Sequence, residues 1–159
     1  MAGGKNYDVA QLLAANQPII KKTEIEFYYT GLKWRNAPKG APKSDDGAIC
    51  LAKLRLDGFV SLDAGAREGS VLTKPLVMEG KSLHLNVAAA EGAVRAEILD
   101  ARGKRVLSGF SRSECLPVRG DRLNAELKWK RAEVSLLAGK TVRLRFILRN
   151  ASLYAFWTR

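Results

Sequence analysis

Aromatic and cationic side chains gather in the stretch EFYYTGLKWRN, at residues 26–36, where they could bind a ligand. Trp34 follows a Thr-Gly break and stands between two cations, of which Arg35 comes directly after it. An exposed aromatic ring can stack on the apolar C–H face of a sugar while neighbouring polar side chains bond the hydroxyls. Trp34, Arg35 and Tyr28 are therefore candidate ligand-binding residues. The alternative is that Trp34 packs beneath the loop that follows it.

A second set of cations lies in the run TVRLRFILR. Arg143, Arg145 and Arg149 fall on one face of a strand, because side chains alternate between the two faces. If this run pairs with the following run SLYAFW, the register decides whether Tyr154 lies beside the arginines. Cations beside aromatic rings suit carboxylated or sulfated sugars, and also nucleic acid. The alternative is a wet face on which arginine stems cover apolar surface.

The sequence contains no recognisable catalytic or metal-binding motif. His84 is the only histidine and no acid adjoins it, whereas serine hydrolase chemistry needs a histidine oriented by a carboxylate. Asp45, Asp46 and Asp57 fall in expected turns, where aspartate bonds to the backbone, and not in a paired-acid motif. We therefore expect neither an enzyme nor a bound cofactor. A structural Ca²⁺ held by oxygen ligands of SDDG or SLDAG stays open as an alternative.

The composition indicates a folded and strongly basic protein. Hydrophobic residues make up 47% and charged residues 27% of the 159 residues, as in globular domains. The net charge of +11 favours polyanions, whether nucleic acid, acidic glycan or anionic membrane. Cys50 and Cys115 are expected to be buried as small apolar residues, with a disulfide as the alternative. No apolar run has the length of a membrane span, and the start MAGGKNYD lacks the core of a signal peptide.

Apolar and polar residues alternate along most of the chain, which is the period of β-strands. The alternating runs are EIEFYY, KSLHLNV, GAVRAEIL, AELKWK and TVRLRFILR. In the first of them, Phe27 shares a face with Ile25 and Tyr29 and is expected to lie in the core. MEGK and DARGK carry glycine where a tight turn needs positive φ. Helical patterns are weak: DVAQLLAAN predicts two turns, and AEVSLLAGK predicts one turn closed by glycine.

The best candidate boundary is NAPKGAPKSDDG at residues 36–47, which holds two Pro, two Gly and no large apolar residue. This loop joins the run at 24–30 to AICLAKLR at 48–55, and we expect the two runs to pair as a hairpin. Residues 1–56 are too few to fold alone, so we expect the hairpin to pack on the larger part of the chain, residues 57–159. A turn at Asp-Gly separates the two parts.

From residue 47 onward, four sequence motifs resemble, in content and in order, a region of a known protein family. The motifs are GAICLAKLRLDGFVSLDAG, LTKPLVMEGKSLHLNV, AEILDARGKRVLSGF and LAGKTVRLRFILRNASLYAFW. They resemble the C-terminal region of bacterial proteins related to five-bladed β-propeller glycosidases, in which the last blade runs into a C-terminal β-sandwich. PIIKKTEIEFYYTGLKWR is similar to the strand pair of that last blade.

We expect an all-β fold, with a jelly-roll-like antiparallel β-sandwich at 57–159 preceded by a β-hairpin at 1–56 that resembles a propeller-blade remnant. The catalytic carboxylates of such glycosidases lie in earlier blades, so no residue here inherits a catalytic role. The resemblance implies either a C-terminal fragment or a separate module. It also implies an extracellular or periplasmic location and an attached or associated glycoside hydrolase domain.

The expected function is a non-catalytic carbohydrate-binding module that favours acidic polysaccharides. One alternative is a structural sandwich that braces a propeller. The other is a basic nucleic-acid-binding domain, which the charge alone supports and for which no RNP, helix-turn-helix or finger signature is found.

Overall fold

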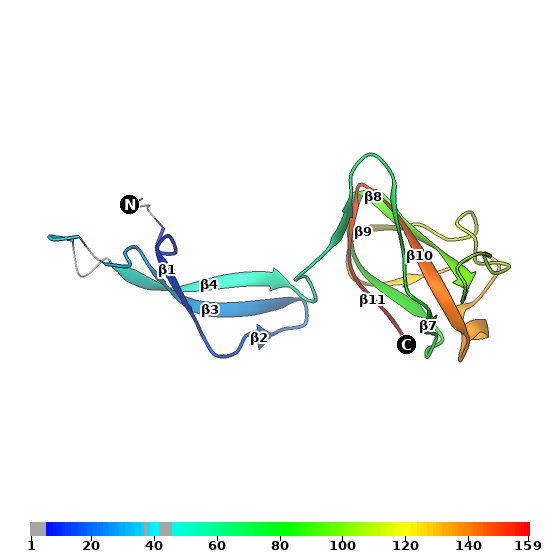
Figure 1. The fold of residues 1–159 in the computed structure, drawn as a ribbon, viewed down its shortest axis with the longest axis horizontal. Helices are drawn as coiled ribbons and strands as arrows, with labels where there is room; N and C mark the ends of the chain where they lie inside the picture. Colours follow the sequence, from blue (N-terminus) through cyan, green and yellow to red (C-terminus); the bar gives the residue numbers. More distant parts are fainter. Residues whose placement is uncertain (1–5, 37, 42–45) are drawn as a thin grey trace. The chain divides into compact units, whose positions relative to one another are not determined.

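The structure, a computed structural model, describes residues 6–36, 38–41 and 46–159 and consists almost entirely of antiparallel strands (Figure 1). The expected all-β, antiparallel fold class is confirmed. The chain separates into two compact units, Met1–Leu56 and Asp57–Arg159. Each unit has its own sheet.

The N-terminal unit is built around one central strand. Its strands are β1 (Gln11–Ala14), β2 (Ile19–Ile20), β3 (Glu24–Leu32) and β4 (Gly47–Arg55). β3 pairs along its whole length with β4, which confirms the expected hairpin. β1 and β2 pair with β3 at its two ends, and because a strand has only two edges they share the edge opposite β4.

Two local expectations for this unit are wrong. The helix predicted from DVAQLLAAN is absent, and Leu12 and Leu13 belong to β1, where they pair with Gly31 and Thr30 of β3. Pairing with a neighbouring strand outweighs a weak helix propensity. Phe27 is half-buried rather than buried, because the described part of this unit forms a single sheet and no second sheet covers the ring.

The C-terminal unit is a β-sandwich. Its elements are β5 (Leu62–Ala64), β6 (Gly69–Leu72), β7 (Leu76–Val77), β8 (Leu83–Asp100), β9 (Val118–Leu127), the 3₁₀ turn η2 (Val134–Leu137), β10 (Thr141–Arg149) and β11 (Ala151–Thr158). The one-turn helix predicted from AEVSLLAGK is confirmed as η2, and the following Gly139 has φ +75.

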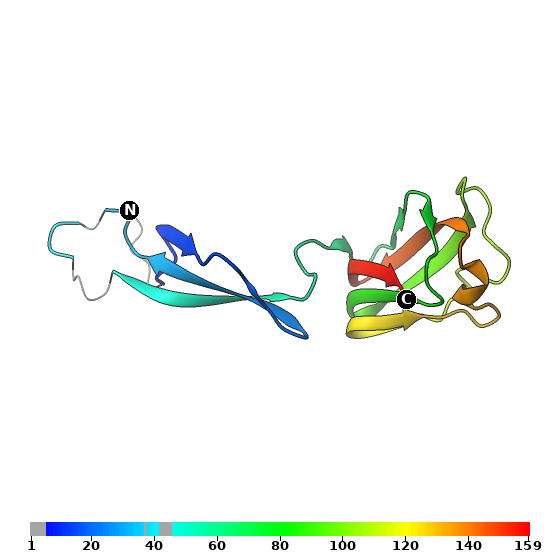
Figure 2. The ribbon, with the colours of Figure 1, turned by 90° about the horizontal axis from the view of Figure 1, so that it is seen from below.

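Strand β8 belongs to both layers of the sandwich. Its first half pairs with β11 on one side and β9 on the other, and these three strands lie side by side near the C-terminus in Figure 2. Its second half pairs with β10, which also pairs with β6 and β7. The register of β8 against β9 shifts between Ala89 and Val94, where the strand passes from one layer to the other. Strands that change sheets through bulges and bends are typical of orthogonally packed sandwiches.

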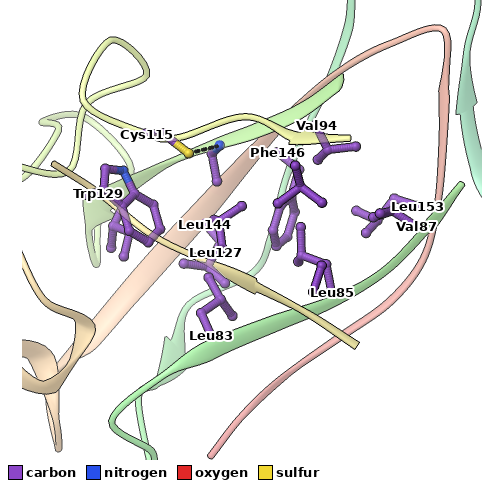
Figure 3. Close-up of a cluster of buried hydrophobic side chains, with 14 of the residues drawn as sticks. Leu83, Leu85, Val87, Val94, Cys115, Leu127, Trp129, Leu144, Phe146 and Leu153 are labelled. Atoms are coloured by element: carbon purple, nitrogen blue, oxygen red, sulfur yellow. Dashed lines mark hydrogen bonds between the residues drawn. The ribbon is translucent and has the colours of Figure 1, made fainter. Parts of the chain in front are cut away.

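The core lies between the two layers (Figure 3). The alternating residues predicted to face inward are buried: Leu83, Leu85, Val87, Val94, Ala96, Ile98, Leu127, Trp129, Val142, Leu144, Phe146 and Leu148. Both cysteines are free, but Cys50 is half-buried rather than buried as expected. Cys115 is buried, and its sulfur accepts a hydrogen bond from the amide N–H of Ala96 at 3.2 Å. Burial raises the pKa of the Cys115 thiol, so it stays protonated and unreactive.

The two predicted glycine turns differ in their cause. Gly103 has φ +71, as DARGK requires. Gly80 in MEGK instead lies against the backbone of Arg159, where a Cβ atom would overlap with the chain. Glycine is needed at both positions, but at Gly80 the reason is space rather than positive φ.

Candidate functional site

Two of the predicted arginines are held by the sandwich itself. The Nε–H of Arg143 donates to the carbonyl oxygen of Ala101 at 3.1 Å, and Arg145 forms an ion pair with Glu97 at 2.8 Å. Arg143 lies opposite Leu99 in the register, and Leu99 is only 1% exposed although it belongs to the outer face. This geometry favours the alternative in which arginine stems cover apolar surface.

The pairing between TVRLRFILR and SLYAFW that would have placed Tyr154 beside the arginines does not form. β10 and β11 lie in different layers and both pair with β8. The chain changes layer at Asn150, which has φ +43 and donates its N–H to the carbonyl oxygen of Gly65 at 2.8 Å. Tyr154 lies at a bulge of β11 and lines an apolar hollow of about 170 Å³ with Phe146 and Phe156. The structure therefore does not place Tyr154 beside the arginines of β10.

Arg149 lies apart from the other two arginines. It is exposed and lines a hollow of about 220 Å³ at the bend of β8, together with Arg119, Glu91, Gly92 and Asn150. We call this the arginine hollow. Arg119 was not predicted from the sequence, because only the fold brings the start of β9 to the end of β10.

The aromatic stretch of the N-terminal unit stays a candidate site. Trp34 is half-buried just after β3, Arg35 is exposed, and Tyr28 is 42% exposed opposite Leu51 of β4. Residues 37 and 42–45, in the loop beneath which Trp34 was alternatively expected to pack, lie outside the described residues. The binding role of these three residues remains a prediction.

The described residues contain no group of three or more His, Cys, Asp or Glu side chains that could hold a metal ion. Of the two motifs considered for calcium, Ser44 and Asp45 of SDDG lie outside the described residues. In SLDAG, hydrogen bonds from the hydroxyls of Ser152 and Ser61 hold the pKa of Asp63 below its usual value. The carboxylate of Asp63 is therefore already hydrogen-bonded by side chains of the sandwich.

The outer face of β11, β8 and β9 carries a row of side chains that could bind a polar ligand. Trp157, His84 and Glu126 are direct neighbours across the three strands. His84 points outward, since Leu83 and Leu85 on either side of it are fully buried. The rings of His84 and Trp157 stack with their centroids 5.9 Å apart and their planes 15° apart.

Polar and charged groups surround these two rings. Ser82 Oγ lies 2.9 Å from His84 Nε2, and Lys128 Nζ lies 2.9 Å from the carboxylate of Glu126. The guanidinium carbon of Arg159 lies 6.0 Å from the centroid of the Trp157 ring, at the outer limit of a cation–π contact. We call these residues the β8 platform: Ser82, His84, Glu126, Lys128, Trp157 and Arg159.

A polar hollow of about 260 Å³ opens at one end of the β8 platform and is lined by Lys81, Ser82, Glu126 and Lys128, among others. Trp129 also lines this hollow, and its buried indole Nε1 has no hydrogen-bond partner among the described residues. The sequence showed His84 and Trp157 only as members of alternating strands. Their meeting depends on a register between distant strands, which the alternation does not specify.

The contact between Ser82 and His84 resembles a nucleophile and its base, but its surroundings do not support acyl transfer. His84 Nδ1 is buried without a hydrogen-bond partner in the described part of the chain, so no carboxylate orients the ring. The amide N–H groups of Lys81 and Ser82 both donate to the carbonyl oxygen of Arg159 and cannot stabilise an oxyanion. The platform can therefore bind a polar ligand through a stacked ring, a hydroxyl, a carboxylate and cations.

Comparison with known proteins finds no match to a family model, to a curated protein or to a solved structure. Within the described residues, no helix is long and apolar enough to cross a bilayer.

Proposed function

We propose that the chain is a non-catalytic carbohydrate-binding module and that the β8 platform holds the sugar. The observation that carries this proposal is the stacked pair of Trp157 and His84 on an outer sheet face, beside Ser82 and Glu126. Sugar rings present apolar C–H faces that pack on aromatic rings, while their hydroxyls bond to carboxylate and hydroxyl groups. Arg159 is exposed, so a sugar ring can replace its weak contact with Trp157.

The charges favour acidic polysaccharides over neutral ones. Lys81 and Lys128 line the polar hollow, Arg159 lies near Trp157, and the whole chain carries a net charge of +11. Carboxylated or sulfated sugars would be attracted by this field and bonded by the nearest cations. These charges, together with the resemblance to propeller-related proteins, support a role as a binding module that acts beside an attached or associated glycoside hydrolase. Binding would raise the local concentration of polysaccharide at that enzyme.

We expect Trp157→Ala to weaken glycan binding by roughly ten- to a hundredfold, because an aromatic contact is worth about 1–3 kcal/mol. The melting temperature should change little, since Trp157 lies on the outer face. A glycan array identifies the ligand, and calorimetric titration of the best hit measures the affinity.

Phe156→Ala is the matched control for this prediction. Phe156 precedes Trp157 on the same strand but packs on Phe146 of the core side, with ring centroids 5.0 Å apart. This variant should lose stability and keep its affinity while folded. Equal affinity of Trp157→Ala and the wild type would overturn the platform as the sugar site.

A salt series separates stacking from charge. Neutral-glycan binding that persists in salt supports the β8 platform, because stacking is not screened. Binding to every polyanion, nucleic acid included, that disappears at moderate salt supports charge alone and the nucleic-acid alternative.

We also expect the purified chain to hydrolyse no glycoside. Among the described residues, no carboxylate orients His84, and the amide N–H groups of Lys81 and Ser82 already donate to Arg159. The sequence also has no paired-acid motif of the kind that glycosidases use. Release of a chromophore from aryl glycosides measures this directly. Turnover that one carboxylate substitution abolishes would contradict the non-catalytic assignment.

One observation favours the structural alternative, in which the chain braces a propeller. One face of the N-terminal sheet carries exposed apolar residues, including Leu13, Tyr28 and Ile49, of which Ile49 is 81% exposed. Exposed apolar patches commonly mark contact surfaces. A chain that binds no glycan on the array, at low or high salt, would favour this function over sugar binding.

A further inference from the structure

We infer that the arginine hollow at the bend of β8 is a second binding site, which takes the sulfate or carboxylate group of an acidic glycan. Arg119 and Arg149 come from different strands, β9 and β10, and line one hollow of about 220 Å³. This inference deepens the proposed function and rests on it, because it names the chemical group that makes acidic chains the preferred ligand.

The arginine hollow lies where the backbone of β8 packs tightly against the turn that follows β10. Gly92 lies so close to the carbonyl oxygens of Arg149 and Asn150 that a Cβ atom would overlap with them. Asn150 holds the turn from β10 to β11 with φ +43. Arg119 Nη1 donates to the carbonyl oxygen of Gly92 at 3.0 Å, which fixes the guanidinium at the edge of the hollow.

The side chains around the hollow suit an oxyanion. The hydrogen bond from Arg119 to Gly92 uses one N–H of the guanidinium. Because a guanidinium has five N–H donors and no acceptor, the other donors of Arg119 can bind an anion. Arg149 is exposed and can present its planar fork, which matches a carboxylate or sulfate in a bidentate way. The side-chain amide of Asn150 offers two further donors. Among the described residues that line the hollow, Glu91 is the one acid, and the two arginines outweigh its charge.

The hollow is separate from the β8 platform. His84 and Gly92 are eight positions apart along β8, and none of the described residues lines both the arginine hollow and the polar hollow beside the platform. The acidic preference and the stacking can be removed independently, by different substitutions.

The experiment titrates the full chain with three matched oligosaccharides, one neutral, one carboxylated and one sulfated, and with inorganic sulfate. Arg149→Gln is the main variant, and it leaves the Arg119–Gly92 bond intact. Arg149→Lys keeps the charge but loses the fork. Arg131→Gln is the control for net charge, because Arg131 is 81% exposed and lines none of the hollows described.

We expect Arg149→Gln to weaken binding of the acidic oligosaccharides about tenfold or more and to leave neutral binding unchanged. Arg149→Lys should fall between the wild type and Arg149→Gln. An equal loss with Arg131→Gln would show that only net charge matters and would overturn the site, as would unchanged acidic binding in Arg149→Gln. If Trp157→Ala loses all glycan binding but still binds sulfate, and this sulfate binding depends on Arg149, the result supports the oxyanion site. Absence of glycan binding by the wild type would instead be a failure of the proposed function.

Discussion

Replacing Gly92 by alanine should destabilise the sandwich by about 3 kcal/mol or more. The new Cβ atom would overlap with the carbonyl oxygens of Arg149 and Asn150. Both are backbone atoms, so no flexible side chain can move aside to relieve the overlap. The bend of β8 and the turn after β10 would have to separate, and the arginine hollow between them would open. Urea denaturation followed by circular dichroism measures the loss of stability.

Gly65→Ala is the matched control for this substitution. No atom lies within 4 Å of a Cβ built on Gly65, and its φ is not in the left-handed region. The control should therefore change the free energy of unfolding only slightly. If Gly92→Ala is as stable as Gly65→Ala, the close approach at the bend is not a determinant of the fold.

Phe146→Ala should lower the free energy of unfolding of the sandwich by about 3–5 kcal/mol. Phe146 is only 1% exposed and lies between the two layers (Figure 3). Its ring packs against that of Phe156, with centroids 5.0 Å apart. Its removal leaves a cavity that the surrounding leucines and valines, held by strands on both sides, can fill only in part. Urea denaturation monitored by near-ultraviolet circular dichroism gives the free energy.

Phe156→Ala again provides the comparison, since Phe156 is 38% exposed and should cost clearly less. A loss below about 1 kcal/mol for Phe146→Ala, at the level of an ordinary surface change, would contradict the position of the core.

The strands of the sandwich could be predicted from the sequence because their signal is local. Leu83, Leu85, Val94 and Ile98 alternate with polar residues, and a period of two requires no knowledge of the neighbouring strands. Local pattern did not reveal that the runs KSLHLNV and GAVRAEIL form one continuous strand. The alanines and Gly92 between them resemble a break, whereas they make the bend that carries β8 from one layer to the other.

The candidate sites depended on information that the sequence does not contain. Arg149 was identified from its charge, but Arg119 joins it only through the course of β9. Trp157 and His84 are 73 positions apart and meet because β11 pairs with β8 in one register. Arg143 was likewise a candidate ligand-binding residue from the sequence alone. In the fold, its side chain instead donates a hydrogen bond to the carbonyl oxygen of Ala101.

Membership of β8 in both layers has a consequence for how this protein is made. The strands that flank β8 directly, β9, β10 and β11, all follow it in the chain, and β11 begins at Ala151. During synthesis, eighteen largely apolar residues of β8 therefore emerge before any of these three strands exists. Such a segment has exposed edges and apolar faces that can associate with other nascent chains.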